Sequence, residues 1–145
     1  MIRITDALLG EHGVIYPLLD HLAGTPFTSG AEARAQAAFL AAGLGSHARI
    51  EDELLFAQLE AHLGAEAGPL AVMRREHEEI ENVLAHLEKA DAPGEARQLA
   101  THLVQLARQH FAKEEQVLFP MAEQLLGEQV LRDLGEQWAA QRRGA

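Results

Sequence analysis

Histidine and glutamate recur along the chain at spacings that suit metal ligation. His47 and His110 are each followed four residues later by a glutamate. Side chains four residues apart share one face of an α-helix, and imidazole nitrogens and carboxylate oxygens are ligands of divalent transition metals. A lone histidine precedes each of these pairs. The candidate metal ligands are therefore His12, His47, Glu51, His77, His110 and Glu114.

The segments that carry these residues form an internal repeat. The segment 11–15 returns 65 residues later, and the segment 47–56 returns 63 residues later. Two copies of a helical hairpin, packed about a pseudo-twofold axis, would bring the repeated residues together. The repeat therefore predicts one shared site rather than two separate ones.

The composition of the 145 residues predicts an all-α fold. Apolar residues occupy 48% of positions but aromatic residues only 5%, and the excess is alanine and leucine, which favour helices. The short links favour an up-down-up-down four-helix bundle over residues 4–126, with a short C-terminal helix over about 128–142, in one domain spanning 1–145. Capping residues, glycines and prolines set the expected bounds of the helices. The first helix is expected from its N-cap Thr5 to Gly24, and the second from a capping box of Ser29 and Glu32 to Leu63. The third is expected from Pro69 to about Ala90, the fourth from the turn 91–94 to Leu126, and a fifth after Gly127.

Helical geometry places the candidate ligands in the interior. At about 100° per residue, His12 and His77 fall within the apolar stripes of their helices. Glu51 and Glu114 lie on the same face as the histidines four residues before them. Two buried carboxylates need positive charge nearby, and two divalent cations fit best. Each cation would take two histidines, and the two glutamates are suited to bridge them, leaving an open position for a small molecule.

Charge and cysteine content exclude several classes of protein. The formal net charge is −10, which repels nucleic acid and anionic lipid surfaces. There is no cysteine, so thiolate zinc sites, iron–sulfur clusters and disulfides are excluded. No apolar stretch approaches the ~20 residues that span a bilayer, and the N-terminus does not read as a signal peptide. We expect a cytoplasmic protein that binds neither nucleic acid nor membranes; the sequence names no protein partner.

The order of these motifs resembles the hemerythrin-like (HHE cation-binding) domain family. A lone His, a His-x-x-x-Glu, a second lone His and a second His-x-x-x-Glu follow one another, one to a helix, and the segment 110–120 is similar to the family's fourth-helix signature. The resemblance covers roughly residues 4–126. It implies a non-haem centre of two iron ions, oxo- or hydroxo-bridged, with Glu51 and Glu114 bridging and the four histidines as terminal ligands. Zinc or manganese are the alternative metals.

One position departs from the family pattern. Oxygen-carrying hemerythrins have a fifth histidine one turn before the third-helix histidine, and that position is Met73 here. A thioether is a poor ligand for hard iron, and Glu81 and Tyr16 are the candidates to fill or gate the vacancy. We therefore expect a protein that binds or senses O2, NO or peroxide. An enzyme that decomposes peroxide or oxidises ferrous iron, and a metal-free bundle that binds a protein, are the alternatives.

Other polar residues are interpreted as structural. The acidic runs 51–53 and 76–81 are expected to be mostly solvated, and Glu115 is expected to face outward. Met73, Leu84 and Val117 are expected to pack around the site. The remaining expectations are that Pro17 and Pro120 kink their helices, that Trp138 anchors the last helix, that Arg142-Arg143 is a frayed tail, and that His21, His62, His86 and His102 play structural roles.

Overall fold

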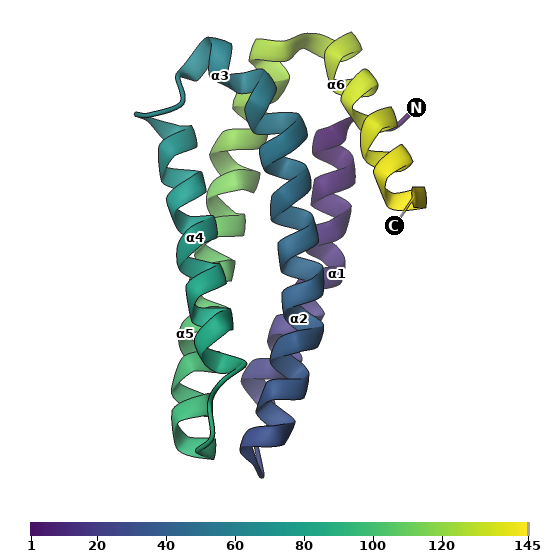
Figure 1. Ribbon diagram of the computed structural model, residues 1–145. Helices are drawn as coiled ribbons and strands as arrows, with labels where there is room; N and C mark the ends of the chain where they lie inside the picture. The colour runs from purple at the N-terminus through teal and green to yellow at the C-terminus, as the bar shows by residue number, and fades with distance from the viewer. Residues whose placement is uncertain (145) are drawn as a thin grey trace.

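A computed structural model describes residues 1–144, and in this part of the chain it contains helices and no strand. Four long antiparallel helices form a bundle in which α1, α2, α4 and α5 are neighbours in that order around the axis (Figure 1). This confirms the predicted all-α, up-down-up-down bundle. The helices are α1 (Ile4–Gly24), α2 (Gly30–Ile50), α3 (Ala57–Leu63), α4 (Pro69–Leu87), α5 (Pro93–Lys113) and α6 (Phe119–Gly144).

The second and fourth predicted helices each contain a π-helical segment. Segment η1 (Glu51–Phe56) joins α2 to α3, and segment η2 (Glu114–Leu118) joins α5 to α6. A π turn adds one residue to the helix and rotates everything that follows. Regular helical geometry therefore fails beyond Glu114, and Val117 is 52% exposed rather than packed around the site as predicted.

Most predicted helix ends are confirmed to within a few residues. Ser29 caps α2 by accepting a hydrogen bond from the Glu32 amide at 3.2 Å, although the Glu32 carboxylate accepts from Thr28 and not from Ser29. The prediction that Thr5 is an N-cap is wrong, because α1 begins at Ile4 and buried Thr5 donates to Glu123.

The predicted third helix is a few residues too long. Helix α4 ends at Leu87, and the amides of Lys89 and Ala90 bond three residues back, as in the tight turns that close helices. A side chain at Gly30 would collide with the carbonyl of Asp91, so the start of α2 packs directly on this turn.

The C-terminal helix is the part of α6 after Gly127, which has φ 76° and breaks the helix as predicted. From there α6 turns over the end of the bundle and runs beside α1 (Figure 1). A side chain at Gly135 would collide with the carbonyl of Ile2, so the two chain ends pack closely. The helix continues to Gly144, two residues beyond the predicted end.

The core consists of two hydrophobic clusters. One contains Leu19, Leu44, Ile80 and Leu84, and the other contains Leu8, Leu55, Met73 and Leu118. The six candidate ligands belong to neither cluster. Among residues 1–144, no helix is long and apolar enough to cross a bilayer.

Candidate metal centre

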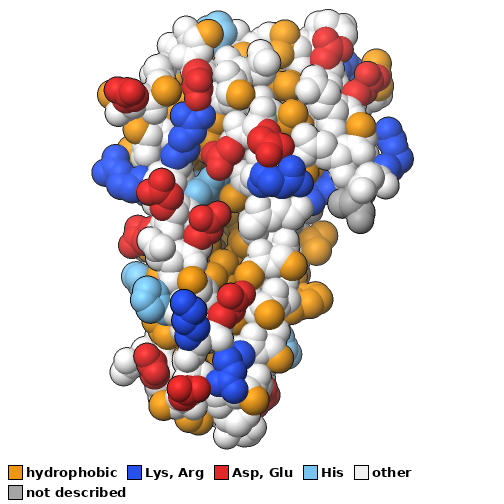
Figure 2. All heavy atoms as spheres, in the orientation of Figure 1, with side chains coloured by type: hydrophobic (Ala, Val, Ile, Leu, Met, Phe, Trp, Pro, Cys, Tyr) orange, Lys and Arg blue, Asp and Glu red, His pale blue; other side chains and the backbone are white. Residues whose placement is uncertain are grey.

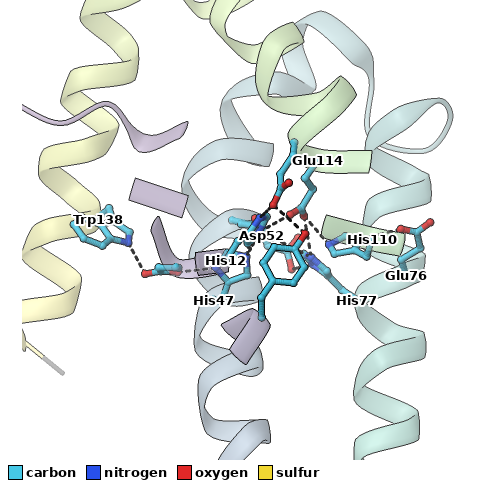
Figure 3. A network of polar contacts seen from close by, with 12 residues as sticks. His12, His47, Asp52, Glu76, His77, His110, Glu114 and Trp138 are labelled. Atoms are coloured by element: carbon cyan, nitrogen blue, oxygen red, sulfur yellow. Dashed lines mark hydrogen bonds and ion pairs between the residues drawn. The ribbon is translucent and has the colours of Figure 1, made fainter. Parts of the chain in front are cut away.

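All six candidate ligands converge in the interior of the bundle. Figure 3 shows the four histidines and Glu114 pointing toward one another. The six ligands come from α1, α4 and the ends of α2 and α5, where the π segments begin. The most exposed of the six, His77, has a relative exposure of only 6%. A buried cluster of this kind is costly unless its polar atoms are paired or bound to a cation.

The donor atoms form two groups that share both carboxylates. One group is His12, His47, Glu51 and Glu114, and the other is Glu51, His77, His110 and Glu114. Within each group the donor atoms lie within 4.8 Å of one another.

Each shared carboxylate points one oxygen toward each group. Glu51 lies 3.0 Å from His47 Nε2 through Oε1 and 3.2 Å from His77 Nε2 through Oε2. Glu114 lies 3.0 Å from His12 Nε2 through Oε2 and 2.6 Å from His110 Nε2 through Oε1. This is the arrangement of two bridging carboxylates.

The donor set passes a test of fit for divalent cations. Both oxygens of Glu51 and Glu114 and the Nε2 atoms of His77 and His110 are buried, and their close contacts lack hydrogen-bond geometry. Two ligands bound to one ion at about 2.1 Å and at right angles lie about 3 Å apart. The Nε2 atoms of His12 and His47 are 3.1 Å apart, so the cluster has the dimensions of a metal site.

Each of the four imidazoles donates its Nδ1 hydrogen to a carboxylate. A neutral imidazole that donates through Nδ1 carries its lone pair on Nε2, so these bonds aim all four lone pairs at the centre. The pairs are His12 with Glu115 at 2.8 Å, His47 with Glu11 at 2.6 Å, His77 with Asp52 at 3.3 Å, and His110 with Glu76 at 2.8 Å.

Sequence reasoning missed these four acids. Glu115 was expected to face outward, and Asp52 and Glu76 were assigned to solvated faces; all three instead support histidines. A signal was available, because Glu11 and Glu76 each precede a candidate histidine in the repeat. Asp52 and Glu115 likewise each follow a candidate glutamate.

The carboxylates control the charge state of the histidines. Burial acts to lower the pKa of His47, but the charge of Glu51 and the hydrogen bond to Glu11 outweigh it and raise that pKa to about 10. Burial also acts to lower the pKa values of His77 and His110. The carboxylates around these two histidines outweigh it and raise the values to about 12 and about 9. Burial acts to raise the pKa of Glu114, but the close imidazoles of His110, His12 and His77 outweigh it and lower that pKa. The centre therefore attracts positive charge, either protons or metal ions.

The two residues expected to fill or gate a vacant position lie outside both donor groups. Tyr16 donates from its hydroxyl to Glu115 Oε1 at 3.0 Å. Glu81 is exposed, and Met73 packs in the hydrophobic cluster with Leu8. The remaining histidines are also outside the donor groups and are all exposed, namely His21, His62, His86 and His102.

The C-terminal helix contacts Glu11, the carboxylate that accepts a hydrogen bond from His47. Trp138 Nε1 donates to Glu11 Oε1 at 2.7 Å, and Arg142 Nε donates to the same oxygen at 2.6 Å. The other oxygen of Glu11 accepts from His47. The prediction that Arg142 belongs to a frayed tail is therefore wrong. Figure 3 shows Trp138 on the His47 side of the centre and Glu76 beyond His110 on the opposite side.

A small cavity of about 20 Å³ adjoins the centre between α2, α4 and α5. Three of the candidate ligands line it, namely His47, His77 and His110. Figure 2 shows this face hollowed between α4 and α2, with hydrophobic side chains at the bottom of the hollow. The cavity therefore lies between the donor cluster and apolar side chains of α2 and α4, among them Leu44, Ile80 and Leu84.

Comparison with known families gives one match. The family model described as "Hemerythrin HHE cation binding domain" matches residues 3–122. Comparisons with curated proteins and with solved structures gave no match. The matched residues include both donor groups and all four acids that support the histidines.

Proposed function

Because the chain belongs to the hemerythrin HHE cation-binding domain family, we propose that it is a non-haem di-iron protein that binds or senses a small ligand such as O2, NO or peroxide. His12 and His47 would hold one iron, His77 and His110 the other, and Glu51 and Glu114 would bridge the two. The observation that carries the proposal is the pair of donor groups that share both buried carboxylates.

The surrounding residues fit this role. The four carboxylates on Nδ1 fix the orientation of the imidazoles, which strengthens metal binding. Glu51 and Glu114 offset the charge of the cations. Iron bound there supplies a redox-active Lewis acid with room for an added ligand. The hydrophobic clusters on either side keep bulk water away.

Small-molecule binding is the interaction that we propose. The net charge of −10 disfavours nucleic acid and anionic membranes as partners. The cytoplasmic location expected from the sequence stays a prediction.

Elemental analysis and the optical spectrum of the aerobically purified protein test the proposal. We expect two iron ions per chain and the near-ultraviolet absorption of a ferric di-iron centre, both lost in Glu51→Ala. The matched control is Glu53→Ala, because Glu53 is an exposed acid two residues away. Less than one metal per chain under all loading conditions would overturn the proposal, and two zinc or manganese ions would contradict its assignment of iron.

Ligand addition tests the second part of the proposal. A reversible spectral change with NO or O2, without turnover, is the expected result. Continuous oxygen evolution from peroxide, or sustained oxidation of added ferrous iron, would instead assign the protein to the enzymes.

A further inference from the structure

The two halves of the centre differ where the internal repeat breaks down. Phe111 stacks on His12 with a centroid distance of 3.9 Å, and the ring of Tyr16 meets Phe111 edge-on at 5.5 Å. The repeat offsets of 63 and 65 residues pair Phe111 with Ala48 and Tyr16 with Glu81. The half that contains His77 therefore has a methyl group and an exposed carboxylate where the other half has two aromatic rings.

The opposite faces of the same histidines do not differ in this way. His77 stacks on Phe56 at 5.5 Å, and His12 stacks on Phe119 at 5.6 Å. Phe56 and Phe119 are equivalent in the repeat. The difference between the halves is thus confined to the side on which Phe111 and Ala48 lie.

The small cavity lies on this side. Ala48 and Glu81 line it together with the apolar side chains of Leu44, Ile80 and Leu84. Its volume of about 20 Å³ exceeds the ~10–15 Å³ needed to hold one water molecule. Its size suits a molecule of two heavy atoms, and its apolar walls suit a neutral one.

The larger groove between α1 and α2 does not offer an equal route. Its volume is about 300 Å³ and His47 is part of its lining. Glu11 and Arg142 also line it, and Glu11 is bonded to the Nδ1 atom of His47. The groove therefore adjoins the Nδ1 side of His47, which Glu11 occupies, rather than the Nε2 atoms of the donor groups.

We propose that the small ligand binds in the cavity between α2, α4 and α5, against the His77 half of the centre, and that Ala48 leaves the space for it. The ligand class is a neutral molecule of two heavy atoms, such as a diatomic gas or hydrogen peroxide. This inference rests on the proposed function, since it locates the ligand of that same site. A phenylalanine at position 48 would lie over His77 as Phe111 lies over His12.

The substitution Ala48→Phe tests the proposal directly. Iron-loaded protein is mixed with NO, and the association rate is followed by absorbance. We expect two irons per chain as before and an association slowed by at least about tenfold, because the added ring occupies the ligand's space. The matched control is Ala38→Phe, the same change at an exposed position of the same helix, for which we expect an unchanged rate.

Two further variants keep the test decisive if Ala48→Phe does not fold. Ala48→Leu should slow NO association by an intermediate amount, and Leu84→Ala, which enlarges the cavity, should speed it. Unchanged rates in these variants with two irons per chain would overturn the inference and leave the proposed function standing. Absence of iron from the unmodified protein would overturn the proposed function itself, so the two failures are distinguishable.

Discussion

The two halves of the bundle hold equivalent ligands in unequal surroundings. Each half supplies two histidines, a shared glutamate, two Nδ1 acceptors and a π segment that begins at the shared glutamate. The features that repeat are those that a pair of cations needs. The pseudo-twofold symmetry thus extends from the donor atoms to their supports.

The features that differ lie outside this shared set. Phe111 and Tyr16 fill one half, whereas Ala48 and Glu81 leave a cavity in the other. Glu11 receives hydrogen bonds from the C-terminal helix, whereas the equivalent Glu76 bonds, among residues 1–144, only to His110 and to half-exposed Lys113. The comparison teaches that the donor atoms and their Nδ1 acceptors repeat in the two halves, while the residues that pack around them do not.

Removal of either shared carboxylate, Glu51 or Glu114, should have the largest effect. Glu51→Ala and Glu114→Ala each remove an oxygen from both donor groups, so each should weaken both metal positions by more than the ~10–100-fold typical of supporting residues. His12→Ala and His77→Ala should each impair mainly one position. Metal content by elemental analysis after loading checks this. Loss of only one ion in Glu51→Ala would show that the carboxylates do not bridge.

Acidification should release the metals. Since the pKa values of His47, His77 and His110 are raised to about 10, 12 and 9, metal ions must displace protons, and affinity should rise about tenfold per pH unit for each proton displaced. In the metal-free protein, the protonated histidines stabilise the folded state. This stabilisation is greatest below pH 6.5, the pKa of histidine in the unfolded chain, and it is lost as the pH rises through about 9 and above.

Calorimetry of zinc-loaded and metal-free protein measures this linkage. The Tm difference between the two forms should grow between about pH 6 and about pH 9. A constant Tm difference over this range would contradict the displacement of protons.

Substitution of the supporting carboxylates Glu11 and Glu76 should affect metal binding unequally in the two halves. Glu11→Gln affects hydrogen bonds from His47, Trp138 and Arg142. We therefore expect it to weaken zinc binding about tenfold, a larger loss than Glu76→Gln causes. Trp138 is the only tryptophan in the chain, so its fluorescence reports on this contact and should change on zinc binding. Exposed Glu78→Gln is the control. Equal losses in the two variants would mean that the C-terminal helix adds no support.

Much of this arrangement follows from the sequence because helices repeat regularly. Helical geometry was enough to place His12 and Glu51 in the interior, where the structure has them. It failed for Val117 and Glu115, which follow the start of a π turn, since no local signal in the sequence announces an added residue. The contact of Arg142 with Glu11 joins residues far apart in the chain, and only tertiary packing reveals such contacts.

The smallest effect is expected where the halves differ by a proline. Segment η1 forms with Ala57 at the position that Pro120 holds after η2, so a π turn forms in this fold without a proline. Pro120 is exposed, and Pro120→Ala restores a backbone donor there. The variant should keep two metals per chain and change the free energy of unfolding by less than about 1 kcal/mol. A loss of metal, or a much larger destabilisation in chemical denaturation, would show that the fourth helix needs the proline to shape its turn, and the equivalence of the two π segments would then be only apparent.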